Sequence, residues 1–388
     1  MPNDLATTTR TARELHGLCV LARAPGVDAD TLQTIVTHFG SIDAVLGADT
    51  ASLRAAGLRP AAARAITTPD ALQIERDLRA VQRYALELLP AHEATYPAKL
   101  REISAAPAVL FVRGAANALA KPQLAIVGSR NPTANGRETA RDFAHRLAQL
   151  GLGITSGLAV GIDAAAHEGA LLAAGTTIAV CATGLDLTYP PQHAALAERI
   201  AASGALISEF PPGTPPLPHH FPQRNRLISG LARGVLVVEA ARRSGSLATA
   251  RCAGEQGRDV FAIPGSIHSA LSRGCHALIR QGAKLVENVD DILTEIEINQ
   301  EFHILTSTFT QPSNPSGDGP SLDNPGEILL DALGFEPTSV DTLIASTGLS
   351  STSVASLLLA LELEGRVASD GLGRYFRVIR LSLGGPAA

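Results

Sequence analysis

Short apolar runs alternate with stretches of helical spacing between residues 124 and 297. The runs are LAIVG (124–128), LGITSG (152–157), TTIAVCATG (176–184), ALISE (205–209), GVLVVEA (234–240), DVFAIPG (259–265) and AKLVEN (283–288), the last a candidate to close the sheet. Most of them begin or end at glycine, and helical segments such as GRETARDFAHRLAQLG fit between them. This alternation is typical of a parallel sheet with helices on both faces. It predicts an α/β fold, a Rossmann-like, doubly wound, mostly parallel sheet.

The flanking segments have other patterns. Residues 11–75 predict a small helical domain in which Asp28 begins a helix and Gly40 ends it; a sterile-alpha-motif-like or helix-hairpin-helix module and a plain packing domain both fit. We expect a disordered tail at 1–10, a connector at 76–120 with a short strand at Val109–Val112, and the sheet domain at 121–297. A Ser/Pro-rich linker is expected at 298–324 and a winged helix at 325–382.

Composition narrows the possible partners. The sequence has no apolar run of the roughly 18–20 residues that a membrane helix needs, and its first ten residues lack a signal-peptide core, so we expect a cytoplasmic protein without a membrane partner. The net charge is −5, yet residues 224–284 hold ten Lys and Arg against three acids. This tract predicts a focused anion site. A solvated helix face is the alternative.

Ligands of open α/β sheets bind outside the carboxyl ends of the strands, and here those ends are rich in glycine, hydroxyl and arginine side chains. The candidate contacts follow the first, second, fourth and fifth strands: Gly128, Ser129, Arg130, Ser156, Gly157, Phe221, Arg224, Asn225, Arg226, Arg242, Arg243, Ser244, Gly245 and Ser246.

The residue types point to phosphate. Arginine presents a fork of donors suited to phosphate oxygens, and Ser244-Gly245-Ser246 opens a predicted helix whose N–H groups favour an anion. Phe221 fits base stacking or core packing equally well. Several phosphate donors beside one ring suit a nucleic-acid strand better than a single small phosphate.

Signals for catalysis are weak. The sequence lacks the GxxxxGK[ST] motif, and Gly151, Gly153 and Gly157 only approach GxGxxG. Asp163 and His167 are four residues apart on a predicted helix. This spacing fits a catalytic pair or metal ligands, and it fits a helix-capping Asp with a packed His equally well. Glu239 fits a general base, although a role in positioning Arg130 or Asn225 is favoured. We expect no catalytic residues, cofactor or metal, with Asp163, His167 and Glu239 in supporting roles.

Several ordered motifs resemble the DNA-processing protein A (DprA/Smf) family: GSR, SGLAVGIDAAAH, TGLDLTYP, SEFPPG, FPQRNRLISGL, VVEAARRSGSLATA, GRDVFAIPG and GCHALIRQGA. The resemblance implies a non-enzymatic protein that binds single-stranded DNA, forms a homodimer through the Rossmann-like domain and loads the recombinase RecA during natural transformation. It also implies that Arg130 is a main phosphate contact, that Phe221 lies against the strand and that the RRSGS turn lines the same groove. Here Arg243 replaces a common lysine and His276 a common asparagine.

Two alternatives remain. A phosphoribohydrolase-like nucleotide enzyme would use Glu239 with the arginines. A duplex-binding regulator would use the winged helix, but residues 324–388 carry seven acids against four basic residues, and the expected recognition helix TSVASLLLALELEG has no basic residue. We therefore expect the winged helix to contact protein or to stabilise the chain.

Overall fold

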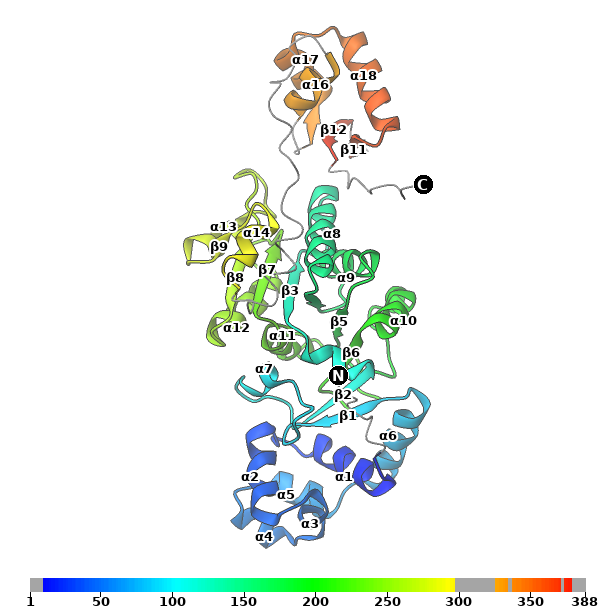
Figure 1. Cartoon of the computed structure of the whole chain (residues 1–388), viewed down its shortest axis with the longest axis vertical. Coiled ribbons are helices and arrows are strands. Elements are labelled where there is room, and N and C mark those ends of the chain that lie inside the picture. Colours follow the sequence, from blue (N-terminus) through cyan, green and yellow to red (C-terminus); the bar gives the residue numbers. More distant parts are fainter. Residues whose placement is uncertain (1–9, 297–324, 334–336, 371–372, 379–388) are drawn as a thin grey trace, which may run out of the picture. The chain divides into compact units, whose positions relative to one another are not determined.

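The computed structural model describes residues 10–296, 325–333, 337–370 and 373–378 (Figure 1). The chain divides into two compact units, and each has its own hydrophobic core. The expected linker at 298–324 and nearly all of the expected N-terminal tail lie outside the described residues. Arg10 is described, and its guanidinium donates to both carboxylate oxygens of Glu93 at 2.6 and 2.9 Å.

The larger unit is built on one nine-stranded sheet, with the order β1-β2-β6-β5-β4-β3-β7-β8-β9. Its strands are β1 (Glu87–Pro90), β2 (Val109–Gly114), β3 (Gln123–Gly128), β4 (Gly153–Ser156), β5 (Thr177–Val180), β6 (Ala205–Ser208), β7 (Gly234–Val238), β8 (Asp259–Ala262) and β9 (Lys284–Leu285). The strands from β3 to β9 pair in parallel, whereas β1 and β2 pair antiparallel. The predicted α/β class, with a mostly parallel sheet, is confirmed.

Helices cover both faces of this sheet. The helices between β1 and the C-terminal elements are α7 (Ala98–Arg101), α8 (Ala134–Gln149), α9 (Ile162–Leu172), α10 (Ala194–Ser203), α11 (His220–Leu231), α12 (Ser246–Glu255), α13 (Arg273–Arg280) and α14 (Val289–Leu293), with 3-10 turns at Ala116–Ala120 and Pro191–His193. Of these, α9 to α13 contact strands of the sheet. Helices α9 and α10 contact each other, as do α11 and α12. The chain adds β4, β5 and β6 in one direction and then crosses back to add β7 and β8 in the other. Right-handed crossovers therefore place α9 and α10 on one face and α11 and α12 on the opposite face.

Six helices precede the sheet: α1 (Ala12–Arg23), α2 (Ala29–Phe39), α3 (Ile42–Gly47), α4 (Thr50–Ala55), α5 (Pro60–Thr67) and α6 (Ala71–Arg83). As expected, the Asp28 side chain caps α2, and Gly40 ends it in the left-handed conformation. The buried residues of these helices belong to the same hydrophobic core as those of β1 and β2. Strand β1 was not predicted, because ELLP is a short apolar run without a period.

The smaller unit contains the C-terminal helices and a three-stranded sheet. The elements are α16 (Pro325–Leu333), β10 (Thr338–Ser339), α17 (Val340–Thr347), α18 (Ser351–Leu363), β11 (Val367–Ser369) and β12 (Arg374–Arg377). The strands have the antiparallel order β10-β12-β11, as predicted for a winged helix. Within the described part of the chain, no single helix is long and apolar enough to span a membrane; α17 and α18 meet that test only together, across a 113° bend.

Candidate nucleic-acid interface

The sheet changes direction between β3 and β7, and the strongest predicted site residues follow these two strands. Progressing from β3, the chain adds β4, β5 and β6 on one side, then returns to add β7 and β8 on the other. A crevice at the carboxyl ends is expected where the winding reverses. Gly128 ends β3 opposite Val238 of β7. A Cβ at Gly128 would lie 1.9 Å from the Val238 carbonyl oxygen, so only glycine fits here.

The turn after β3 is held by backbone contacts from the start of α9. The Ser129 carbonyl accepts from the Ile162 N–H at 3.1 Å, and its hydroxyl accepts from the Asn131 N–H at 3.1 Å. Gly161 has φ +87°, and a Cβ there would lie 2.4 Å from the Ser129 carbonyl oxygen. Ser129 is therefore buried under the turn, whereas Arg130 is exposed.

Arg130 belongs to a cluster with two aromatic residues, which we call the aromatic cluster: Arg130, Tyr189 and Phe221. The guanidinium carbon of Arg130 lies 5.8 Å from the centroid of the Phe221 ring. Tyr189 meets the same ring edge-on, with centroids 5.5 Å apart. Tyr189 is 46% exposed, and Phe221 is half-buried. A cation and two partly exposed rings beside the carboxyl ends of the parallel strands form a surface that can bind a phosphate and stack a base.

Arg224 does not lie in this cluster, contrary to the prediction of a direct phosphate contact. It is only 4% exposed. Its Nη1 donates to the Gly157 carbonyl at 2.6 Å and also to the Val180 carbonyl. Its guanidinium thus joins the ends of β4 and β5 from below the surface.

Three further predicted residues at the β4 end are internal. Ser156 is fully buried, and its hydroxyl donates to the Ile126 carbonyl at 2.6 Å. Gly157 is also buried. A Cβ there would lie 2.5 Å from the Arg224 guanidinium, so a larger residue would collide with it. Asp163 accepts from the N–H groups of Gly157 and Ala159 at 3.1 and 3.3 Å. These residues support the loop and present no side chain for a ligand.

Arg226 and Asn225 also differ from their predicted roles as direct contacts. Arg226 forms an ion pair with the Glu209 carboxylate, so its charge is already partnered. Burial raises the pKa of Glu209, and the nearby charge of Arg226 opposes that rise. Asn225 is half-buried, and its amide donates to the Gly245 carbonyl at 3.4 Å. Asn225 is one turn beyond Phe221 on α11, so the two side chains lie on the same face of the helix. The Asn225 amide therefore connects this helix face to the turn after β7.

The turn after β7 presents two exposed arginines, Arg242 and Arg243. The hydroxyls of Ser244 and Ser246 lie 2.7 Å apart, and the Ser246 N–H donates to the Ser244 hydroxyl at 3.3 Å. Gly245 precedes α12, and a Cβ there would meet nothing within 4 Å. The predicted helix start is confirmed, and the RRSGS turn lies between the end of β7 and the start of α12.

His167 is internal and is not available for catalysis on a ligand. Burial lowers its pKa to about 3. Its Nδ1 lies 2.7 Å from the Thr177 hydroxyl, which itself donates to the Ile154 carbonyl. Since that hydroxyl has one proton, Nδ1–H must be the donor. Burial also raises the pKa of Asp163, against the charge of Arg224. The packed His is thus the interpretation that fits, and the carboxylate of Asp163 serves the loop before α9 rather than a catalytic pair.

The backbone beyond β7 and β8 has distinctive features at Glu239 and His276. Glu239 follows β7 with φ +53°, a conformation that costs free energy for a non-glycine residue. The next residue, Ala240, accepts from the Gly274 N–H at 2.7 Å. His276 Nε2 lies 3.0 Å from the Gly265 carbonyl, so an imidazole bridges α13 to the loop after β8. Among the described residues, no group of three or more His, Cys, Asp and Glu could hold a metal ion.

Sequence reasoning overlooked three residues of this region. Tyr189 was quoted within TGLDLTYP but was not assigned to the site, Gly161 was not separated from its motif, and Glu209 was not paired with Arg226. The exposed aromatic of a strand-end loop was the available signal for Tyr189. The Glu209 pairing has no local signal, because 17 residues separate the partners.

Comparisons with protein-family models show which family the chain belongs to. The family model described as DNA recombination-mediator protein A matches residues 87–297, beginning where β1 begins. The model of the DprA winged helix domain matches residues 312–371. The chain belongs to the DprA/Smf family of DNA-processing proteins.

Individual relatives agree. Protein Smf of Escherichia coli is 45% identical over 310 residues, which are 79% of this chain and 81% of that protein. DNA processing protein DprA of Streptococcus pneumoniae is 50% identical over 202 residues, 52% of this chain and 71% of that protein. The X-ray structure of the S. pneumoniae protein has a TM-score of 0.64 at 38% identity, covering 74% of this chain and 99% of that one. A Helicobacter pylori structure, described by its single-stranded DNA binding mode, has a TM-score of 0.50 at 28% identity, covering 58% and 97%.

Proposed function

We propose that this protein binds single-stranded DNA at the carboxyl edge of its parallel sheet and acts as a recombination mediator. The observation that carries the proposal is the aromatic cluster: the exposed Arg130 guanidinium lies over the Phe221 ring where the winding reverses. Arg130 neutralises a phosphate and Phe221 stacks a base. Arg242 and Arg243 extend the basic surface, because Asn225 ties α11 to their turn. Gly128, Ser129, Ser244, Gly245 and Ser246 let backbone N–H groups approach the strand.

The buried arginine supports this surface from within. Arg224 fixes the ends of β4 and β5, and Arg226 fixes Glu209 beside α11. Only some arginines of the basic tract are therefore proposed to contact DNA, namely Arg242 and Arg243, together with Arg130. Ser156, Gly157, Asp163, His167 and Glu239 hold the loops that carry those contacts.

Family membership supports the finer roles. We propose that the protein protects incoming single strands, loads RecA onto them during natural transformation, acts as a homodimer through the Rossmann-like unit in the cytoplasm, and breaks no covalent bond. The H. pylori structure, which is similar to this chain, is described by its single-stranded DNA binding mode. The winged helix contacts protein or stabilises the chain, since its helix α18 has no basic residue.

The test is a titration of labelled oligo-dT across a salt series, beside matched duplex. Each phosphate contact adds about −0.7 to the log–log salt slope on a single strand. Arg130→Ala should weaken binding and make the slope shallower by about 0.7. Arg64→Ala is the matched control, since Arg64 is an exposed arginine of α5. Binding indifferent to Arg130, or duplex bound more tightly, would reject the assignment, and a nucleotide assay with Glu239→Gln would come next.

A further inference from the structure

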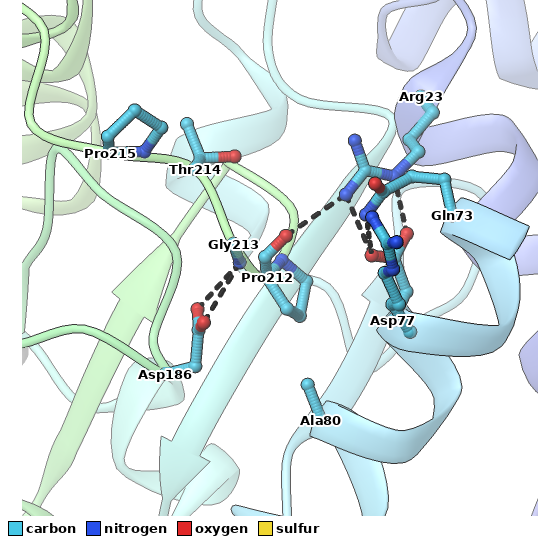
Figure 2. Close-up of a pocket in the computed structure, with 10 residues that line it drawn as sticks. Arg23, Gln73, Asp77, Ala80, Asp186, Pro212, Gly213, Thr214 and Pro215 are labelled. Carbon is cyan, nitrogen blue, oxygen red and sulfur yellow. Dashed lines mark hydrogen bonds and ion pairs between the residues drawn. The ribbon is translucent and has the colours of Figure 1, made fainter.

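An ion pair of the N-terminal helices reaches the loop that follows β6. Arg23, at the end of α1, donates through Nε and Nη2 to both oxygens of Asp77 on α6, the second bond at 2.7 Å. Asp77 also accepts from Gln73 at 3.1 Å, and its side chain is 1% exposed. The same Nη2 donates to the Pro212 carbonyl at 3.0 Å (Figure 2). One guanidinium thus joins α1, α6 and the turn at 211–214.

That turn is also tied to the loop after β5. Both carboxylate oxygens of Asp186 accept from the Gly213 N–H, at 2.9 and 3.0 Å (Figure 2). The Gly184 N–H donates to the Thr214 carbonyl at 3.0 Å. A pocket of about 420 Å³ opens beside these contacts, lined by residues that include Arg23, Asp77 and Asp186. The turn is therefore the point where the helices, the β5 loop and the β6 loop meet.

The two loops that meet at this turn carry the two rings of the aromatic cluster. The loop with Asp186 continues to Tyr189, and the loop with Pro212 continues to Phe221 at the start of α11. Residues 211–218 read PPGTPPLP, and proline fixes φ, so five of these eight residues have little freedom in φ to absorb a displacement at 212. Phe210 precedes this segment and His220 follows it, and their rings stack with centroids 4.2 Å apart. Both ends of the loop are fixed.

We infer that Arg23, held by Asp77, is a positioning residue for the aromatic cluster, so that the N-terminal helices set the geometry of the single-stranded DNA site without touching DNA. The inference rests on the proposed function and adds a role for a helical region that the basic residues do not explain. Arg23 acts through Pro212, and the turn at 211–214 distributes the constraint to Tyr189 and Phe221.

The test compares Arg23→Gln with Arg13→Gln, in the full chain. Arg13 is on the same helix and pairs with Asp43 at 3.2 Å on an exposed surface, so it is a matched control. We expect Arg23→Gln to weaken oligo-dT binding about tenfold, within the range that losing one base–aromatic stack costs. Because Arg23 meets no phosphate, the salt slope should stay at the wild-type value. Arg13→Gln should bind as wild type.

A double-mutant cycle separates positioning from general destabilisation. In the Phe221→Ala background, Arg23→Gln should cost less than about twofold, because coupled residues are not additive. A tenfold loss in both backgrounds would overturn the inference. If Arg23→Gln does not fold, Asp186→Ala releases the same turn from the other side and carries the cycle with the same expected outcomes.

A readout without DNA keeps the two proposals apart. The chain has no tryptophan, so Phe221→Trp places a single fluorescent probe in the aromatic cluster. Adding Arg23→Gln should shift its emission and increase iodide quenching, and adding Arg13→Gln should change neither. An unchanged emission would refute the positioning role even if oligo-dT binds. A shifted emission in a protein that does not bind oligo-dT would leave positioning intact and reject the proposed function.

Discussion

The Arg130 guanidinium lies over one side of the Phe221 ring, 5.8 Å from its centroid, while Tyr189 meets that ring edge-on. A cation over an aromatic face is attracted by the ring's quadrupole, so each side chain limits the rotamers of the other. The pair joins a residue that follows β3 to one on α11, which comes 91 residues later in the chain. The proposed phosphate and base contacts are thus fixed relative to each other before any strand binds.

Removing the ring should weaken single-strand binding without changing the count of phosphate contacts. Phe221→Ala should cost about 1–3 kcal/mol of binding free energy, as for other base–aromatic stacks, with an unchanged salt slope. Tyr84→Ala is a control, because Arg83 lies over Tyr84 at 5.6 Å in a comparable pair outside the site. Fluorescence anisotropy with oligo-dT measures both. Equal losses in the two variants would mean that Phe221 only packs.

Arg224→Ala should lower the stability of the fold more than it weakens single-strand binding. The substitution leaves the Gly157 and Val180 carbonyls without their buried donor, which we expect to cost about 3 kcal/mol of unfolding free energy. Urea unfolding measures it, and Arg243→Ala, an exposed arginine, should unfold as wild type. For folded protein, Arg224→Ala should keep the wild-type salt slope. A stable variant with a shallower slope would restore the direct phosphate contact predicted from sequence.

Gly161→Ala should displace the turn that presents Arg130. At φ +87° a side chain is strained, and its Cβ would lie 2.4 Å from the Ser129 carbonyl, so we expect a loss of at least about 2 kcal/mol of stability together with weaker oligo-dT binding. Gly254→Ala on α12, where a Cβ meets nothing within 4 Å, should not destabilise the protein. Thermal unfolding and anisotropy test both. Wild-type stability and binding of Gly161→Ala would show that the turn can accept a side chain at this position.

The buried imidazole should make stability depend on pH. Burial lowers the pKa of His167 from 6.5 to about 3, so between these values the unfolded chain binds a proton that the folded chain does not. Its contribution is complete above pH 6.5 and falls by about 1.4 kcal/mol per pH unit as the solution is acidified toward pH 3. Urea unfolding at pH 7.5 and 4.5 should show a smaller loss for His167→Asn than for wild type. The exposed His268→Gln should match wild type.

Removal of the winged helix should leave the single-strand site intact. A chain ending at residue 297 should bind oligo-dT within about twofold of the full chain, because α18 offers no cation for phosphate. Filter binding with duplex competitor compares the two chains. A truncated chain that loses duplex binding which the full chain possessed would assign DNA contact to the winged helix instead.

Sequence patterns carried most of the fold because most strands of the large sheet are local apolar runs that begin or end near glycine, and parallel pairing follows from the intervening helices. They also located the site edge, since parallel strands all end on the same side. Burial within α11 was predictable but missed: His220, Arg224, Leu227 and Leu231 follow helical spacing on its buried face. The meeting of Tyr189 with Phe221, and of Arg23 with Pro212, depends on how loops distant in sequence pack, and no local pattern encodes it.

The pairing of β3 with β7 has a consequence for biosynthesis. These strands are joined only after more than a hundred residues have been added, including β4, β5 and β6. A chain still on the ribosome therefore presents β3 as an open edge, and Gly128 has no neighbouring carbonyl to approach. Domains generally fold as units, and pairings between segments distant in sequence form slowly. This edge of the sheet is thus among the last features to form, and the proposed single-strand site stays incomplete in a nascent chain until the sheet is closed on both sides of β3.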